Sequence, residues 1–311
     1  MAVVDVEGIY NEFSYGNKSP RAIKEFLGYA LANWKRAPSY VLLAGDATFD
    51  PKNYLGGGDN DLVPTKLIDT QFMETASDDW FADFDMNGLA ELAMGRLPVR
   101  TAEEAARVVG KIVSYDSSRP SEGILLVADK NVGYDFDGSN DKLRGLIPSS
   151  FRVEQISRNS LDDVTAKGRL LDAINQGQKI VNYTGHGNIG QWKDNLLTND
   201  DVAMLTNRDS LSLFVLMTCL NGYFHDPSAL SLGEALLKGE RGGAVAVWAS
   251  TGMTVPTSQS SINQELLRLV LDTSKRAPTL GEATMKAKSV MADLDVQRTW
   301  VLFGDPTTRL R

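Results

Sequence analysis

Short, almost wholly apolar runs alternate with amphipathic segments along most of the chain. The apolar runs lack the every-second-residue alternation of a half-exposed strand, and such runs are typical of strands buried on both faces. The amphipathic segments between them predict helices that cross over from one parallel strand to the next. The pattern predicts an α/β fold with about six strands in one mostly parallel sheet and helices on both of its faces. Strands are expected at 1–10, 40–46, 92–99, 124–129, 151–157, 179–183, 211–218 and 243–250.

Polar residues that can cap a first turn mark where the helices begin. Ser19 precedes Pro20, and proline is favoured at the first helical position. A second predicted helix covers 163–176 and ends at Gly177. Pairs with the spacing of a capping box are Thr101 with Glu104, Thr198 with Asp201, Ser231 with Glu234 and Thr279 with Glu282.

The polar segment 116–123 separates two parts of the pattern. We therefore expect a smaller N-terminal α/β subdomain over 1–118 and a larger subdomain over 119–311. The opening apolar run has no cap or turn before it, which indicates that the sequence begins inside a domain and is truncated at its start.

Composition narrows the choice of partners. The net charge of −8 disfavours phosphate backbones and anionic lipid, so we expect no nucleic acid partner. No apolar stretch reaches the roughly 20 residues that span a bilayer, so no membrane insertion is expected, and no secretory signal pattern is present. Only one cysteine is present, which excludes an internal disulfide.

That cysteine, Cys219, and one of the two histidines, His186, each follow an apolar run directly. Because the carboxyl ends of neighbouring parallel strands meet at one edge of a sheet, we expect both side chains at that edge. A thiol and an imidazole placed together form the pair needed for a cysteine nucleophile with its base. Backbone N–H groups of Gly187 and Cys219 are the candidate donors for the oxyanion, and the thiol is expected to have a pKa below its free value of about 8.5.

Other interpretations of these residues stay open. Cys219 alone is typical of a buried small hydrophobe, and a histidine between glycines can merely close a turn. His225, expected in a surface turn, is a second candidate base. A zinc site formed by Cys219, His186, His225 and Asp226 is a further alternative, although their spacing matches no common zinc motif.

Acidic residues cluster in the segment 77–88. A solvated loop is the default interpretation of such a cluster, and one carboxylate could orient the histidine. Asp83, Asp85 and Asn87, with the glycine that follows, also resemble the start of a calcium loop, but Met94 stands where that loop needs glutamate. A structural calcium ion is therefore an expectation with weak support from the sequence.

With these residues in place, the chain resembles the gingipain-type cysteine peptidases, whose catalytic domain is caspase-like. The resemblance covers nearly the whole sequence, and its motifs recur in the family's order. They are IYNEFSYG, YVLLAGDATFDP, SDDWFADFDMNGLAELAMGRLPVRT, NYTGHG, MTCLNG, GAVAVWASTG and LFGDP. The resemblance implies a caspase-like three-layer sandwich.

The resemblance also implies roles for individual residues. Cys219 would be the nucleophile, His186 its acid and base, and Gly187 part of the oxyanion hole. Asp78 falls where family members have an acidic residue that assists the histidine. The wall of the primary specificity pocket would include Thr184, Met217, Trp248, Ser250 and Thr251. Gingipains cleave after arginine or lysine, but the segment TGMTVPTSQS departs from their pattern, which puts basic specificity in doubt.

Two classes of function follow from these observations. The first is a cysteine endopeptidase that hydrolyses proteins or peptides through a thioester on Cys219, with no cofactor required for the chemistry. The second is a catalytically silent caspase-like module that serves binding or assembly of a larger secreted protein. The resemblance implies a secreted or cell-surface location, often with calcium. The sequence does not define an oligomeric state.

Overall fold

A computed structural model describes residues 1–118, 120–274 and 276–311. The predicted boundary between residues 118 and 119 therefore falls at the edge of the described residues. The helices are α1 (Val6–Phe13), α2 (Pro20–Asn33), α3 (Ala102–Tyr115), α4 (Phe136–Leu146), α5 (Asp163–Asn175), α6 (Asn199–Met204), α7 (Leu232–Lys238), α8 (Pro256–Val270), α9 (Leu280–Lys288) and α10 (Leu294–Thr299). Short 3-10 turns are η1 (Asp79–Ala82), η2 (Lys193–Asn195) and η3 (Arg208–Ser210).

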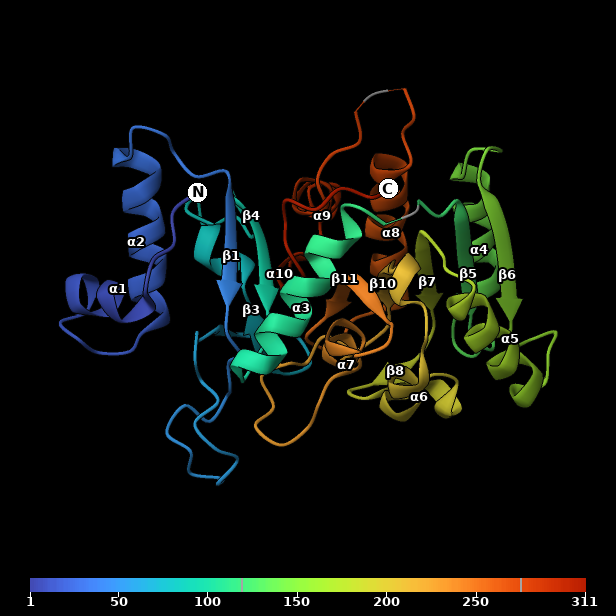
Figure 1. The fold of residues 1–311 in the computed structure, drawn as a ribbon, viewed down its shortest axis with the longest axis horizontal. Coiled ribbons are helices and arrows are strands. Elements are labelled where there is room, and N and C mark those ends of the chain that lie inside the picture. The colour runs from blue at the N-terminus through green and yellow to red at the C-terminus, as the bar shows by residue number, and fades with distance from the viewer. Residues whose placement is uncertain (119, 275) are drawn as a thin grey trace.

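One large sheet organises the described chain. Its strand order is β1-β4-β12-β11-β10-β7-β5-β6, running from one side of Figure 1 to the other. The strands are β1 (Tyr40–Ala44), β4 (Ala93–Leu97), β5 (Gly123–Ala128), β6 (Arg152–Ser157), β7 (Ile180–Thr184), β10 (Ser212–Met217), β11 (Ala244–Ser250) and β12 (Trp300–Phe303). Small hairpins are formed by β2 (Lys66–Asp69) with β3 (Glu74–Ser77), and by β8 (Gly187–Asn188) with β9 (Gln191–Trp192).

Side chains on opposite faces of each strand enter different cores. On β10, Phe214 and Leu216 pack with helices α3, α5, α6 and α7, whereas Leu213, Val215 and Met217 pack with α4, α8, α9 and α10. Because both faces of β10 are covered, all six of its residues are buried and apolar residues dominate it. The three-layer α/β architecture predicted from the sequence is therefore confirmed.

Among the described residues the sheet contains eight strands rather than about six. One strand the pattern missed is β12, a four-residue segment that directly follows α10. It pairs antiparallel with β11 and parallel with β4, through Phe303 and Arg96. A run this short beside a helix carries too little periodicity to be recognised as a strand.

The predicted opening strand is wrong, because residues 6–13 form helix α1. The Asp5 carboxylate caps this helix by accepting a hydrogen bond from the Glu7 N–H. Ile9 and Tyr10 are buried against the neighbouring helix and strands, whereas Val3 lies exposed. The buried positions thus follow the spacing of a helix. The apolar residues at the start of the run 1–10 made it resemble a strand instead.

The three capping boxes at Thr198, Ser231 and Thr279 form as predicted. Thr101 also caps its helix, and its hydroxyl accepts from the Glu104 N–H. Among the described residues no helix is both long and apolar enough to cross a membrane.

Candidate active site

The strands β7 and β10 lie side by side in parallel, and Thr184 pairs with Met217 at their carboxyl ends. The pairing continues one residue further, where the Gly185 N–H donates to the Met217 carbonyl at 3.2 Å. His186 lies two residues beyond Thr184, and Cys219 lies two residues beyond Met217. The fold therefore delivers both residues to the same edge of the sheet, the imidazole exposed and the thiol half-buried.

Glycine is required on both sides of His186. A Cβ atom at Gly185 would lie 2.4 Å from the Asp129 Cβ and 2.4 Å from the Tyr183 hydroxyl. At Gly187 it would lie 2.7 Å from the Thr218 hydroxyl. The turn that carries His186 thus packs directly on Asp129 on one side and on the residue before Cys219 on the other.

The contacts of His186 define which ring nitrogen is free to act as a base. Its Nε2 lies 3.1 Å from the Val132 carbonyl oxygen, and its ring meets the Phe136 ring edge-on at 5.2 Å between centroids. Because a carbonyl can only accept, a neutral imidazole in this position carries its proton on Nε2. The lone pair is then on Nδ1, which is the nitrogen available to take a proton.

Cys219 contacts a different neighbour. Its Sγ donates to the Thr254 carbonyl at 3.5 Å, and burial raises the pKa of the thiol. The expectation of a lowered thiol pKa is therefore wrong, because desolvation disfavours the charged thiolate. At neutral pH the resting cysteine is a protonated thiol, and it needs a base to remove its proton when it reacts.

The turn after Cys219 is held from several directions. Leu220 adopts a left-handed conformation with φ of 63°, which is strained for a residue with a Cβ. Its N–H donates to the Gly252 carbonyl at 3.2 Å, and the Gly222 N–H donates to the Ser250 carbonyl at 2.8 Å. The Asn221 amide donates to the Asn188 carbonyl at 2.5 Å, tying this turn to the β8–β9 hairpin beyond His186. The two halves of the site are thus joined by direct bonds.

A cavity of about 590 Å³ opens beside His186. Its walls come from the end of β5, from the β8–β9 hairpin and from η2. The lining residues are Asp129, Lys130, Val132, His186, Gly187, Asn188, Gln191, Trp192, Lys193, Asp194 and Asn195. The volume is large enough for side chains of a bound peptide.

Asp129 is a residue that the sequence analysis missed. It follows β5, and its Oδ2 accepts the backbone N–H of His186 at 3.1 Å. Its other oxygen accepts from the buried guanidinium of Arg158 at 2.5 Å. The signal that could have found Asp129 is the one that found His186 and Cys219, namely a polar residue directly after a buried strand.

Asp78, by contrast, is fully engaged elsewhere. Its two carboxylate oxygens accept from the Arg96 guanidinium at 2.6 and 2.9 Å, and Oδ1 also accepts from the Thr65 hydroxyl at 2.9 Å. Asp78 and Arg96 are both buried. These contacts give Asp78 a structural role, and the carboxylate that contacts the His186 turn is Asp129.

All five residues expected to wall the specificity pocket are buried: Thr184, Met217, Trp248, Ser250 and Thr251. The hydroxyl of Thr251 donates to the Ala76 carbonyl at 2.7 Å, and that of Ser250 donates to the Gly252 carbonyl at 3.0 Å. Thr184 donates to the Asn140 side-chain oxygen at 3.1 Å. These polar side chains are thus satisfied within the protein, beneath the site rather than around the open cavity.

His225 does not lie in a surface turn as expected. It is buried, packed against Tyr223, Phe224 and Phe49, and its Nδ1 has no hydrogen-bond partner among the described residues. Burial lowers its pKa to about 3. The neighbouring Asp226 carboxylate accepts from the Ser228 and Ala229 N–H groups. Neither residue joins Cys219 and His186 in a site, so the zinc alternative loses its support.

The buried His225 makes a testable contribution to stability. The unfolded chain protonates this histidine near pH 6.5, whereas the folded protein does so only near pH 3. Between these values the unfolded state binds more protons, so stability falls as the pH falls. From pH 7 to pH 5 the expected loss is about 2 kcal/mol. Urea unfolding of the wild type and of His225→Phe, which keeps an aromatic ring, should show a shallower pH dependence in the variant. Equal slopes would contradict the assignment.

The predicted calcium ligands are arranged differently from an ion site. The Asp83 carboxylate accepts the N–H groups of Asn87 at 3.0 Å and Gly88 at 2.9 Å, while Asp85 and Asn87 are exposed. The ammonium of Lys24 contacts the Asp83 carbonyl at 2.5 Å. In the part of the chain that the structure describes, no group of three His, Cys, Asp or Glu residues could hold a metal ion. Asp83, Asp85 and Asn87 are therefore not gathered as calcium ligands, and a structural calcium ion stays a prediction.

The fold and the paired strand ends define the class of protein. A mostly parallel sheet between two helical layers, with histidine and cysteine at the ends of adjacent strands, is the arrangement of caspase-like cysteine peptidases. The chain belongs to Peptidase family C25, whose sequence profile matches residues 1–311. The resemblance predicted from the motifs is thereby confirmed.

The chain is also similar to individual proteins and solved structures. Gingipain R2 of Porphyromonas gingivalis is 24% identical over 314 residues, covering 93% of this chain and 40% of the relative. The crystal structure of gingipain R, an arginine-specific cysteine proteinase, matches with a TM-score of 0.79 and 21% identity over 94% of this chain and 69% of that one. The separase–securin complex of Saccharomyces cerevisiae matches with a TM-score of 0.50 and 16% identity over 68% of this chain and 14% of that one. The chain thus spans about two fifths of the length of Gingipain R2.

Proposed function

We propose that this protein is a cysteine endopeptidase. The observation that carries the proposal is the pairing of Thr184 with Met217, which places His186 and Cys219 at matching positions on adjacent strand ends. Membership of a peptidase family supports the same activity. Proteins or peptides are the proposed substrates, and the cavity beside His186 provides space for them.

The reaction begins when Nδ1 of His186 takes the proton from the Cys219 thiol. For this the imidazole turns away from the Val132 carbonyl, and the thiol leaves the Thr254 carbonyl. The hydrogen bond between thiol and imidazole then forms only when substrate is bound. The sulfur attacks the scissile carbonyl carbon, a C–S bond forms, and the carbonyl electrons move to the oxygen. Backbone N–H groups of Gly187 and Cys219 stabilise this oxyanion.

The tetrahedral intermediate then collapses to the acyl-enzyme. His186 gives its proton to the amide nitrogen, the C–N bond breaks, and the amine product leaves. Water next attacks the thioester with His186 as base, and the C–S bond breaks to release the acid and return the thiol. No step requires a cofactor.

Specificity is proposed to differ from that of gingipain R. The polar groups next to Thr184 are uncharged amides: Asn140 accepts its hydroxyl, and Asn182 and Asn263 bond to each other at 2.6 and 3.1 Å. A basic side chain in the open cavity beside His186 would have to compete with Arg158 for the carboxylates of Asp129 and Asp194. Burying a charge without a partner is costly.

We therefore expect kcat/KM for peptides with arginine or lysine before the scissile bond to be at least about ten-fold lower than for the peptide with the best neutral residue at that position. Cleavage of a peptide library that varies this position alone, scored by kcat/KM, measures the preference. Arginine ranking above every neutral residue would overturn the expectation.

The alternative function is a catalytically silent caspase-like module for binding or assembly. One observation favours it, because thiol and imidazole each bond to a different carbonyl in the resting structure. Absence of hydrolysis across a broad peptide library, with the protein shown to be folded, would favour this alternative. We also propose a secreted or cell-surface location, which rests on the gingipain resemblance.

A further inference from the structure

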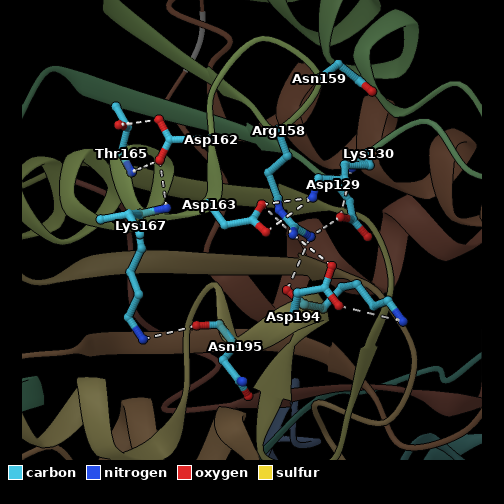
Figure 2. A network of polar contacts seen from close by, with 12 residues as sticks. Asp129, Lys130, Arg158, Asn159, Asp162, Asp163, Thr165, Lys167, Asp194 and Asn195 are labelled. Carbon is cyan, nitrogen blue, oxygen red and sulfur yellow. Dashed lines mark hydrogen bonds and ion pairs between the residues drawn. The ribbon is translucent and has the colours of Figure 1, made fainter.

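Arg158 is a buried cation beside the His186 turn that the proposed reaction does not use. It directly follows β6, its side chain is 0% exposed, and its guanidinium pairs with three carboxylates. Nη1 contacts Asp129 at 2.5 Å, and Nη2 contacts Asp163 at 2.9 Å and Asp194 at 2.8 Å, as Figure 2 shows. A buried guanidinium is stable only with such partners. Several charge-assisted hydrogen bonds therefore hold the Arg158 side chain in this position.

The contacts of Arg158 reach the main chain of His186 from both sides. On one side, Asp129 binds Arg158 through Oδ1 and accepts the His186 N–H through Oδ2 at 3.1 Å. On the other side, Arg158 donates to the Lys193 carbonyl at 3.3 Å, and the Lys193 N–H donates to the His186 carbonyl at 2.9 Å. Both polar groups of the His186 backbone are therefore bonded to residues that Arg158 holds.

The segment on the second side of His186, η2, contains backbone in the left-handed region. Asp194 and Asn195 in η2 have φ values of 55° and 58°, in the left-handed region. Aspartate and asparagine reach this region more easily than other residues with a Cβ, and the ion pair from Arg158 to Asp194 helps to hold it here. Loss of this pair should let η2 relax and carry Lys193 away from the His186 carbonyl.

We propose that Arg158 is a positioning residue for His186: through Asp129 and the Lys193–Asp194 segment it fixes the turn that carries the imidazole. The inference rests on the proposed peptidase function, in which His186 moves the proton. A small displacement of an acid or base is enough to slow proton transfer strongly. Asp129 acts through the same backbone bond and is a positioning residue as well.

The first experiment compares Arg158→Lys and Arg158→Gln with the control Arg169→Gln. Arg169 is a half-exposed arginine on α5 that pairs with Glu154, which is itself partly exposed. We expect kcat to fall about 100-fold in Arg158→Gln and about 10-fold in Arg158→Lys, which keeps a charge but loses the fork, with KM changed less than about two-fold. The control should stay within two-fold. Unchanged kcat in a folded Arg158→Gln protein would overturn the proposal.

A second pair of variants avoids leaving a buried charge unpaired. Asp194 and Asp163 bond to the same Nη2 of Arg158, and their side chains are similarly exposed at 46% and 49%. Asparagine tolerates the left-handed conformation at 194. We expect Asp194→Asn to lower kcat about three- to ten-fold and Asp163→Asn to leave it unchanged, because Asp194 belongs to η2, which bonds to the His186 carbonyl, whereas Asp163 belongs to α5. Equal effects of the two substitutions would show a merely structural role.

A third measurement does not depend on peptidase activity. The chain has two histidines, so selective ¹⁵N-histidine labelling gives two backbone amide signals, those of His186 and His225. Hydrogen exchange at His186 should speed up at least ten-fold in Arg158→Lys, while exchange at His225 stays unchanged. Equal acceleration at both sites would mean general loosening and would refute positioning. Suppose that neither the wild type nor any variant cleaves peptides, but Arg158→Lys speeds up hydrogen exchange at His186 alone. The proposed peptidase function would then be wrong, and the proposal that Arg158 fixes the His186 turn would still hold.

Discussion

Cys219→Ala is expected to lower peptide hydrolysis by on the order of 10⁴-fold or more, because no other cysteine in the chain can form the thioester. Cys219 is half-buried and its sulfur makes a single hydrogen bond, to the Thr254 carbonyl. Removing it should cost about 1 kcal/mol of stability or less, so the variant should fold. Peptidase activity and urea unfolding, measured on the same preparations, separate the two effects.

Alkylation supplies the control for this substitution. Iodoacetamide should add one label to the wild type and none to Cys219→Ala, and labelling of the wild type should abolish activity. Because burial raises the pKa of the thiol, the labelling rate without substrate should climb steeply as the pH is raised above neutrality. A Cys219→Ala protein that keeps a hundredth of the wild-type activity would show that another group performs the attack.

Breaking the buried ion pair between Asp78 and Arg96 should cause the largest loss of stability among the substitutions proposed here. Arg96 is 0% exposed and also donates to the carbonyls of Gly45 at 2.7 Å and Val63 at 2.8 Å. Replacing Asp78 with asparagine leaves the guanidinium without its counter-charge, and breaking a buried pair in this way typically costs about 3–5 kcal/mol. We expect Asp78→Asn to lower the free energy of unfolding by this amount, as measured by urea titration.

Activity distinguishes this structural role from the role that the family resemblance implied. If Asp78 oriented His186, Asp78→Asn would lose kcat at temperatures where it is fully folded. The contacts predict instead that the folded fraction keeps kcat within about three-fold, because the His186 turn bonds to Asp129. Asp85→Asn, an exposed aspartate seven residues along the chain, is the matched control and should change neither quantity.

Much of the site was predictable from strand ends alone. His186 and Cys219 follow apolar runs directly, and parallel pairing of those runs is enough to bring them to one edge. Capping residues likewise located helix starts, because a capping box needs only residues within one turn. The sequence pattern therefore predicted the strand ends and helix starts, which are set by interactions between residues close together in the chain.

The features that the sequence did not predict depend on contacts between distant segments. Arg158 and Asp129 follow two separate strands, and Asp194 joins them from a third segment. His225 follows a turn-like sequence, yet Phe49 from a remote loop packs against its ring and seals it from solvent. Asp78 could be assigned to His186 only by analogy, since its pairing with Arg96 emerges from the packing of β4 against the preceding loop.

The place of β12 in the sheet has a consequence for biosynthesis. This strand lies between β4 and β11, yet it is translated after every other strand of the sheet. Until it leaves the ribosome, β4 and β11 cannot be joined within the sheet, because β12 is the strand that pairs with both. The sheet can therefore be completed only late in synthesis. Its completion depends on strand pairing between residues about 200 positions apart in the sequence.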